Sequence, residues 1–479
     1  MDTEQIGRVK RRLERIGSQA AERKDTELML ETIRARGELG YWLNAEYEDD
    51  AAERLLLQLK GECLPHQKED SRILFYDGFG FDTRGLALIY LKALKKNGYQ
   101  LLYITAVENA EAQPHIMALL AEEDKIIFSK PMALTERLAW LRKLFTQEPF
   151  STAFFYTTPW DAAGAAAFQE LDGCCRRFQI DLTDHTLWTG LNAFDYCIEF
   201  REYGASNAVF GRGIPKEKLV ELPYYPEIDR ESPFQGFPFN PKGRKVIFSG
   251  GALHKTMDPA GTFYRIIEHL VTAHEDTIFL YAGWGDASKI REAEAKYPGR
   301  VYYVEERPDV YQLLRHADLY LNTYPVSGAL MLQFAAEAGR VPVTLKRPWD
   351  DDPEGILIQQ ERLGETFTDF DACCAELDKL LVDDGYRREK EALLPGMVIS
   401  EEDFTSRLDC LIRNPEPAWM ENPKQYDTTL FRQAMAENFT EEMLTSAVIN
   451  RETKRLYRFF PGLLAKKLLG KMHGGATSA

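Results

Sequence analysis

The residues best suited to bind a phosphate lie in two turns, each of which follows a strand-like segment. In the first turn, Gly250 and Gly251 let a ligand oxygen approach the backbone, and Lys255 supplies a positive charge. In the second turn, Ser327 is the expected N-cap, and Gly328 leaves the first amides of a helix uncovered. Because free N–H groups and the helix dipole favour an anion, the second turn predicts a diphosphate site. For the first turn, an ordinary glycine turn is the alternative.

Glu337 lies on the helix that begins at the second turn, roughly three helical turns beyond Ser327. Its neighbours in the sequence are small, with AAEAG over 335–339. A solvated helix charge is one interpretation. The small neighbours favour close packing instead, where an ionised carboxylate needs a partner.

Acid–base chemistry is predicted where Asp184 precedes His185 at the end of another strand-like segment. The ordinary histidine pKa suits proton transfer near neutral pH, and a neighbouring carboxylate can orient the ring. A histidine bonded to a loop carbonyl is the alternative. A glycine-rich loop over 77–85 offers Asp82 or Asp77 as a second base, although a turn-forming aspartate is favoured there. Nearby aromatic residues suit stacking on a sugar or, equally, a core: Trp160, Trp188 and Phe194.

Metal and cysteine chemistry are not predicted. The acidic run Asp350-Asp351-Asp352 contains an Asp-x-Asp pattern of the type that can hold a divalent ion, but a surface acidic turn is the favoured interpretation. The sequence has no HExxH and no His/Cys cluster, so no metal and no resident cofactor are expected. Seven cysteines, an odd number, do not predict a disulfide framework. The adjacent pairs at 174–175 and 373–374 are expected as small apolar residues in helices of a protein from a reducing cytosol.

Composition and charge exclude several classes of protein. The 479 residues are 44% hydrophobic and 28% charged, which is typical of a folded chain of more than one domain. The formal net charge of -16 argues against general nucleic-acid binding. No stretch reaches the ~20 apolar residues that cross a bilayer, and the polar start has no secretion signal. A cytoplasmic protein is therefore expected.

The order of the expected elements predicts two α/β domains. A helical cap is expected over 1–65, an α/β domain over 66–230, a second over 240–400, and C-terminal helices over 401–479, with a proline-rich linker at 226–244. Strand-like and helix-like runs alternate in both central segments, which is typical of parallel, doubly wound sheets whose ligands bind at the carboxyl ends of the strands. The clearest strands are expected at 73–79, 99–105, 245–251, 277–283, 300–306, 318–325 and 341–346.

The second α/β segment resembles the nucleotide-sugar half of GT-B glycosyltransferases, which consist of two facing Rossmann-like domains. The resemblance rests on KVIFSGG with Lys255, then FLYAGWG, then RVYYVEERPDVYQLLRHADLYLNTYPVSGALMLQFAAEAGRVPVTL. It covers 245–346 well and 71–225 only as architecture. Both the group 1 branch and the O-GlcNAc-transferase-like branch share this pattern.

The resemblance implies an enzyme that moves a sugar from a nucleotide-sugar, with UDP favoured, to a hydroxyl of a glycan, lipid-linked or protein acceptor. Such enzymes include those of polysaccharide biosynthesis. Lys255 and the helix start would stabilise the leaving diphosphate without a metal, and His185 would be the base with Asp82 in reserve. Implied donor-binding residues are Gly250, Gly251, Lys255, Arg307, Asp309, Ser327, Gly328 and Glu337.

Two departures from the group 1 pattern keep other functions open. Ala329 stands where that branch has its first glutamate, and the usual arginine before the phosphate lysine is missing. The Thr-Tyr-Pro-x-Ser-Gly turn is closer to the O-GlcNAc-transferase-like pattern, which favours an inverting reaction. The alternative is a catalytically inactive subunit that binds a partner transferase or a glycan. A nucleotide-sugar epimerase or dehydrogenase is disfavoured because no dinucleotide fingerprint is present.

The C-terminal segment reverses the sign of the chain. Residues 451–479 contain seven Lys/Arg and one acid, interleaved with apolar residues such as Leu468 and Leu469. A basic amphipathic segment can lie on an anionic membrane, which predicts peripheral contact with the inner face. A final helix that packs back onto the N-terminal domain is the alternative.

Overall fold

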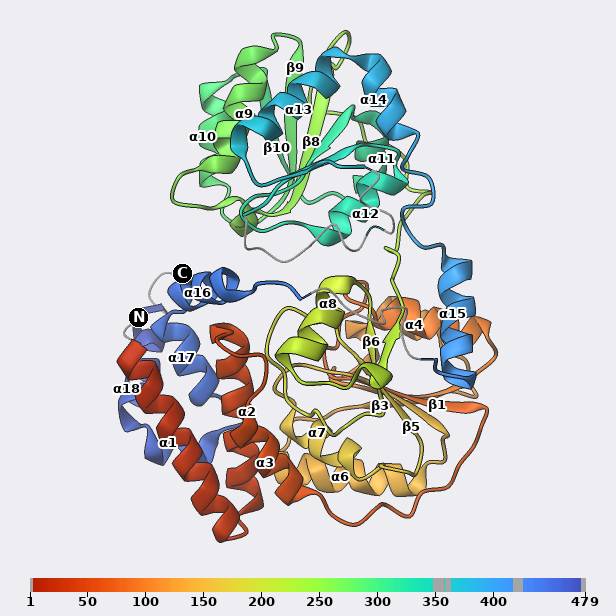
Figure 1. The fold of residues 1–479 in the computed structure, drawn as a ribbon, viewed down its shortest axis with the longest axis vertical. Coiled ribbons are helices and arrows are strands. Elements are labelled where there is room, and N and C mark those ends of the chain that lie inside the picture. The colour runs from red at the N-terminus through yellow and green to blue at the C-terminus, as the bar shows by residue number, and fades with distance from the viewer. Residues whose placement is uncertain (1–2, 348–356, 358–362, 417–424, 475–479) are drawn as a thin grey trace. The chain divides into compact units, whose positions relative to one another are not determined.

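The computed structural model describes residues 3–347, 357, 363–416 and 425–474 (Figure 1). The chain divides into two compact units, residues 1–222 with 405–479, and residues 223–404. The expected helical cap and the C-terminal helices thus belong to the same unit as the first α/β segment. Residues 223–230, which the sequence analysis assigned to the first domain, lie in the second unit. The predicted triple aspartate at 350–352 lies outside the described residues.

The first unit contains a seven-stranded parallel sheet in the order β3-β2-β1-β4-β5-β6-β7. Helix α4 covers one face, and α6 and α7 cover the other (Figure 1). The central strands are buried on both faces, which explains their continuous apolar sequences, such as ILFY at 73–76. The strands are β1 Arg72–Asp77, β2 Gln100–Thr105, β3 Lys125–Phe128, β4 Thr152–Tyr156, β5 Arg176–Ile180, β6 Tyr196–Glu199 and β7 Leu219–Glu221. The helices that accompany them are α4 Ala87–Lys96, α5 Pro114–Leu119, α6 Leu134–Gln147, α7 Ala162–Gln169, α8 Glu202–Ser206 and the π-helix η2 Asn207–Gly211.

A helical layer completes the first unit. Helices from both ends of the chain lie together, since α2 contacts α1, α3, α16 and α17 (Figure 1). Asp25 caps α2 by accepting a hydrogen bond from the N–H of Leu28 at 3.2 Å. The helices of this layer are α1 Thr3–Glu22, α2 Thr26–Leu43, α3 Asp50–Leu59, α16 Thr429–Asn438, α17 Glu441–Val448, η7 Lys454–Phe459 and α18 Pro461–Gly474. Helix α15 Glu401–Arg413, in which the boundary between the two units falls, lies away from the layer and beside α4 (Figure 1), where Asn97 Nδ2 donates to the Thr405 oxygen at 2.9 Å.

The second unit contains a six-stranded parallel sheet in the order β10-β9-β8-β11-β12-β13. Its helices form by apolar spacing; in α9, Phe263, Ile266, Ile267 and Leu270 are all fully buried. The strands are β8 Lys245–Ala252, β9 Thr277–Trp284, β10 Val301–Glu305, β11 Leu319–Leu321, β12 Pro342–Leu345 and β13 Thr366–Phe367. The helices are the 3-10 helix η4 Leu253–Thr256, α9 Thr262–Ala273, α10 Ser288–Lys296, α11 Val310–His316, α12 Ala329–Glu337, α13 Phe370–Val382 and α14 Asp384–Glu391. The prediction of two parallel, doubly wound α/β sheets is confirmed.

The strand expected over 245–251 is confirmed, but Gly250 and Gly251 lie within it and not in the turn expected to bind a phosphate. Strand β8 continues through both glycines to Ala252, and they pair with Ala282 and Gly283 of β9. A Cβ atom on Gly283 would stand 1.9 Å from the Gly251 oxygen, and one on Gly250 would stand 2.8 Å from the Ala282 oxygen. These glycines therefore let two backbones approach closely, and the turn moves to the η4 segment that carries Lys255.

The C-terminal segment packs back onto the helical layer. Leu456, Phe460 and Leu463 belong to the same apolar core as α2 and the face of the first sheet that α6 and α7 cover. Arg455 pairs with Asp25, with Nη2 2.5 Å from Oδ2. Among the helices that the structure describes, none combines the length and apolar character needed to cross a membrane.

The cysteines differ from expectation at one pair. Cys63 and Cys174 form a disulfide that links residues 111 positions apart. The pair at 174–175 also lies outside a helix, because α7 ends at Gln169. Cys373 and Cys374 are buried in α13 as predicted. The spacing of cysteines in the sequence cannot reveal a contact between segments so far apart.

We expect Gly283→Ala to destabilise the second unit by about 1–3 kcal/mol, because the added methyl must displace the β8 backbone. Chemical denaturation followed by circular dichroism measures the change. Gly462→Ala is the matched control, since a methyl there meets open space. Equal midpoints for wild type and Gly283→Ala would show that β8 and β9 do not need the close approach.

Candidate functional site

The predicted phosphate-binding turns come together at the carboxyl edge of the second sheet. Lys255 follows β8 and Ser327 follows β11, and the strand order reverses between these two strands. A parallel sheet binds ligands at such a reversal. The N–H of Val326 donates to the Lys255 oxygen at 3.3 Å, which joins the two loops directly. Val326 and Lys255, 71 positions apart in the sequence, are thus neighbours in space.

A buried asparagine holds the start of α12 in place. The N-cap is Gly328, without a side-chain cap, so the prediction of Ser327 as N-cap is wrong. Asn322 supplies the missing acceptor, since its Oδ1 accepts from the N–H groups of Gly328 and Thr323, each at 2.9 Å. Its Nδ2 donates to Thr344 Oγ1 on the next strand at 3.2 Å. The first amides of α12 itself retain the orientation that favours an anion.

Two aromatic side chains at this edge were not singled out from the sequence. Trp284 ends β9 and is 46% exposed, although it is a large apolar residue. His254 lies beside it, with ring centroids 6.4 Å apart in an edge-to-face arrangement. An exposed ring next to a phosphate-type turn offers a stacking face for a nucleobase. The signal in the sequence was a tryptophan directly after a buried strand.

Glu337 has the partner that the sequence analysis expected for a packed carboxylate. Arg230 Nη2 lies 2.5 Å from Glu337 Oε2, and Arg230 Nη1 donates to the Tyr311 hydroxyl at 2.8 Å. The pair ties the segment after residue 223 to the end of α12. The carboxylate remains 27% exposed.

Arg307 and Asp309, which the resemblance implied as donor-binding residues, form a bidentate ion pair with distances of 2.8 and 2.6 Å. Asp309 is fully buried and also accepts from the N–H of Gln235 at 2.8 Å. Burial opposes ionisation, but the bonds from Arg307 and Gln235 outweigh it and lower the pKa of Asp309. The guanidinium also donates to the Gly236 oxygen, so this pair anchors the segment 235–236 to the loop after β10.

The predicted acid–base pair lies in the loop after β5 of the first unit. His185 Nδ1 is 3.3 Å from Asp184 Oδ1, and the histidine side chain is 35% exposed. Asp184 is buried and receives two bonds from Arg201, at 2.6 and 2.7 Å. Burial acts against the charge, but Arg201 outweighs it and lowers the pKa of Asp184. Asp184 is therefore a fixed anion that can orient the ring, in a network with an arginine that sequence spacing did not indicate.

Asp82 has the structural role that the sequence analysis gave as its alternative. Its Oδ1 accepts from the N–H groups of His115 and Ile116, at 3.0 and 3.1 Å, in the first turn of α5. Its Oδ2 lies 2.6 Å from His115 Nδ1. His115 is largely exposed, so it forms a second His–Asp pair that was not predicted. Asp77 is buried and accepts from the Tyr103 hydroxyl at 2.7 Å.

The aromatic residues near His185 divide between core and surface. Trp188 and Phe194 are 3% and 1% exposed and pack in an apolar core, which excludes stacking on a sugar. Trp160 is half-buried and lines a separate cavity in the first unit. Of these three aromatic residues, only Trp160 is partly exposed.

A buried group of ionisable residues lies close to the His185 network. Asp181, Cys197 and Glu199 place potential metal-ligand atoms within 4.8 Å of one another. The Arg212 guanidinium, also buried, is 3.3 Å from Asp181 Oδ2 and already balances one carboxylate. Because a cation at this point would be repelled by Arg212, the residues fit a metal poorly. Burial, followed by the Asp181 charge, raises the pKa of Glu199 well above its ordinary value.

Three solved structures share the fold. A glycosyltransferase from Rickettsia africae matches with a TM-score of 0.54 at 9% identity, over 74% of this chain and 100% of its own. A protein from Listeria monocytogenes assigned as a UDP-N-acetylglucosamine 2-epimerase matches with a TM-score of 0.53 at 12% identity, over 74% and 98%. A Thermobaculum terrenum O-GlcNAc transferase variant matches with a TM-score of 0.50 at 15% identity, over 88% and 82%.

No protein-family pattern matches the sequence, and no curated protein matches it. At identities this low, the structural likeness establishes the fold. The GT-B class of fold that the resemblance implied is confirmed, with two parallel α/β units in one chain.

We expect the stability of this protein to fall as pH rises, in part through Glu199. A carboxyl whose pKa is higher in the folded state binds its proton more tightly there, so stability is lost between the unfolded pKa near ~4.3 and the raised folded value. Glu199→Gln cannot titrate, so its melting temperature should decline less than that of wild type between pH 5 and pH 8.5.

The exposed Glu217→Gln is the control and should follow wild type. Melting curves at several pH values provide the measurement. Parallel curves for wild type and Glu199→Gln would mean that Glu199 is ionised in the folded protein.

Proposed function

We propose that this protein is a metal-independent glycosyltransferase that moves a sugar from a UDP-sugar to a hydroxyl group of a glycan, lipid-linked or protein acceptor, with inversion. The observation that carries the proposal is the direct junction of the Lys255 loop and the α12 start at the strand-order reversal. This arrangement supports binding of a diphosphate by one cation and a set of oriented N–H groups.

The proposed chemistry follows from where charge develops. As the acceptor oxygen bonds to the sugar carbon, the bond from that carbon to the diphosphate breaks and UDP leaves. Negative charge then grows on the outer diphosphate oxygen, and Lys255 with the first amides of α12 would stabilise it. Trp284 would stack on the base, and Glu337 would bind the ribose hydroxyls in exchange for part of its contact with Arg230. His185, oriented by the fixed anion Asp184, would accept the proton of the acceptor hydroxyl.

The fold supports a nucleotide-sugar enzyme, because the compared proteins are described as a glycosyltransferase, an O-GlcNAc transferase and a UDP-N-acetylglucosamine 2-epimerase. The Listeria protein makes an epimerase a second candidate. The missing dinucleotide fingerprint argues only against an epimerase that uses a dinucleotide. A transferase releases UDP in proportion to an added acceptor, whereas an epimerase converts the nucleotide-sugar into an isomer without an acceptor.

We expect Lys255→Ala to weaken UDP binding about ten- to a hundredfold, since a charge-assisted hydrogen bond contributes ~1.5–3 kcal/mol. Titration calorimetry measures the affinity. Sugar transfer should fall by a further factor, because Lys255 would contact more charge in the transition state than in the bound donor.

The exposed Lys289→Ala, on α10 of the same unit, is the matched control and should bind UDP as wild type does. Unchanged UDP affinity in Lys255→Ala would overturn the donor site. UDP-sugar binding without transfer or isomerisation, across a panel of sugars and acceptors, would favour the inactive subunit instead.

We further propose that the protein acts in the cytoplasm, at the inner face of the membrane, through the end of α18. Leu468 and Leu469 are 56% and 55% exposed. Lys466 and Lys467 on the same helix contact Glu441 and the Ile449 oxygen. The contact with the membrane would therefore be made mainly by the two leucines and not by these lysines. Exposed apolar residues beside basic ones suit an anionic membrane surface.

We expect Leu468→Ser/Leu469→Ser to reduce flotation with anionic liposomes by severalfold, since two large apolar side chains leave the interface. Val382→Ser, which alters an apolar residue 75% exposed in the second unit, is the control. Deletion of 451–479 is unsuitable because it would remove core residues. Equal flotation of wild type and the double variant would exclude this membrane contact.

A further inference from the structure

Two cavities that share part of their lining follow the carboxyl ends of four strands in the first unit. They have volumes of about 560 and 310 Å³ and share Ala106, Arg137, Arg451 and Glu452. Their lining includes the residues just beyond β3, β2, β1 and β4, namely Ser129, Ala106, Gly78 and Thr158. The strand order reverses between β1 and β4, so these cavities occupy the position where a doubly wound sheet binds ligands. We call them together the strand-end crevice.

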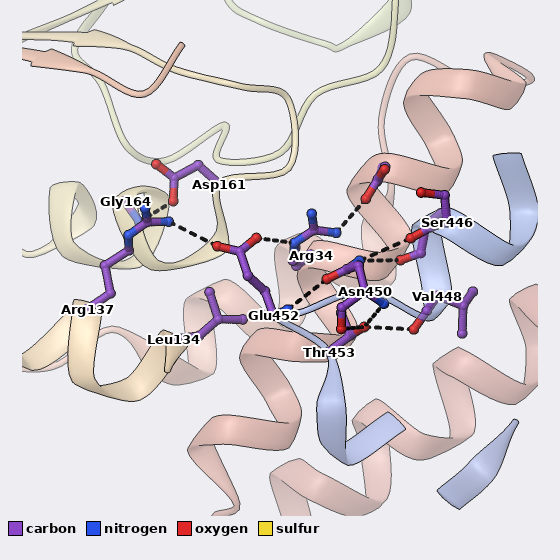
Figure 2. Close-up of polar contacts among 12 residues, drawn as sticks. Arg34, Leu134, Arg137, Asp161, Gly164, Ser446, Val448, Asn450, Glu452 and Thr453 are labelled. Atoms are coloured by element: carbon purple, nitrogen blue, oxygen red, sulfur yellow. Dashed lines mark hydrogen bonds and ion pairs between the residues drawn. The ribbon is translucent and has the colours of Figure 1, made fainter. Parts of the chain in front are cut away.

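Two arginines at this crevice are already paired with a carboxylate of the chain itself. Figure 2 shows Glu452 between Arg34 of α2 and Arg137 of α6. Its Oε2 lies 2.6 Å from Arg34 Nε, and its Oε1 lies 3.5 Å from Arg137 Nη1. Arg34 also pairs with Glu38 at 2.5 Å. The two guanidinium groups thus converge on one carboxylate from opposite sides, as they would on a phosphate or carboxylate ligand.

The Glu452 carboxylate is not needed to hold its own segment. Asn450 Oδ1 accepts from the N–H of Glu452 at 2.9 Å, and Asn450 Nδ2 donates to the Ser446 oxygen at 3.1 Å. Thr453 Oγ1 donates to the Val448 oxygen at 2.8 Å (Figure 2). The turn is therefore fixed to α17 by backbone and neutral side-chain bonds. None of these bonds involves the Glu452 carboxylate, so its displacement from the arginines leaves them intact.

Most other carboxylates at the crevice already accept hydrogen bonds from the protein. Glu27 accepts from the N–H of Thr135 at 2.8 Å, and Glu31 accepts from the N–H of Leu456 at 3.0 Å. Asp161 accepts from the Tyr76 hydroxyl at 2.6 Å and from the N–H of Gly164 at 2.9 Å. Glu108 is the remaining acid of the lining.

Cations without a counterion surround the opening. Lys130, Arg451 and Lys454 line the larger cavity, are exposed, and make no ion pair within the described part of the chain. In a protein with a formal charge of -16, this is a local excess of positive charge. A site with two converging arginines and three available cations attracts an anion.

We propose that the strand-end crevice binds the anionic group, phosphate or carboxylate, of the acceptor, and that Glu452 holds Arg34 and Arg137 until the ligand displaces it. The assignment of the ligand as an acceptor rests on the proposed transferase function, whereas the proposal that the crevice binds an anion does not depend on that function. Glu452 acts as an internal competitor, so it lowers the affinity for weak anions and favours ligands that make further contacts with the crevice.

The test compares Glu452→Gln with wild type in thermal melting against inorganic phosphate, at constant ionic strength in KCl. We expect Glu452→Gln to melt at a lower temperature without phosphate and to reach half of its phosphate response at a roughly tenfold lower concentration, because the competitor is gone. Adding Lys130→Gln/Arg451→Gln should raise that concentration again at least about threefold. The charge-matched Lys242→Gln/Arg388→Gln is the control.

The same series in the Lys255→Ala background separates this site from the donor site. A phosphate response that persists there belongs to the crevice, even if UDP fails to bind. Identical phosphate dependence of wild type and Glu452→Gln would overturn the anion site. A hexose 6-phosphate should bind Glu452→Gln more tightly than inorganic phosphate does; binding of inorganic phosphate alone would overturn the assignment to an acceptor.

Discussion

The rule that parallel strands all end at one edge organises the chemistry of this protein. In the second unit it brings the loop after β8 and the loop after β11 side by side. A backbone hydrogen bond from the N–H of Val326 to the Lys255 oxygen joins them. Asn322 fixes the geometry, because one buried amide bonds to Gly328, Thr323 and Thr344 at once. A buried polar side chain with this many partners determines one arrangement of the loop.

Electrostatics inside the first unit are organised around arginines. Arg201 keeps Asp184 ionised, Arg212 balances Asp181, and Arg34 with Arg137 hold Glu452. Each pair lies beside the carboxyl ends of strands, where the loops carry polar residues into a largely apolar interior. A buried charge needs such a partner, and the partner then decides which groups stay ionised and which, like Glu199, retain a proton.

The packing of the C-terminal segment distinguishes a helix that packs on the N-terminal domain from a segment that lies on a membrane. Leu456, Phe460 and Leu463 enter the helical core, so the first part of the basic segment is a structural element. Arg455 forms an ion pair with Asp25, and Lys466 forms one with Glu441. The amphipathic pattern was therefore produced mainly by a helix that packs on the protein, while the exposed Leu468 and Leu469 near its end remain available for a surface. Apolar periodicity alone cannot distinguish the two uses.

The sequence by itself determined the alternation of strands and helices, because fully buried parallel strands must be continuously apolar and their crossover helices amphipathic. It also predicted that Glu337 needs a partner and that Asp184 lies beside His185, since the first follows from residue type and the second from adjacency in the chain. Only the tertiary structure decided that Gly250 and Gly251 pair within β8, that Asn322 replaces Ser327 at the helix start, and that Asp82 holds α5. It alone brought Arg230 to Glu337, Arg201 to Asp184 and Glu452 to Arg34, because these contacts join segments far apart in the chain and depend on how the elements pack.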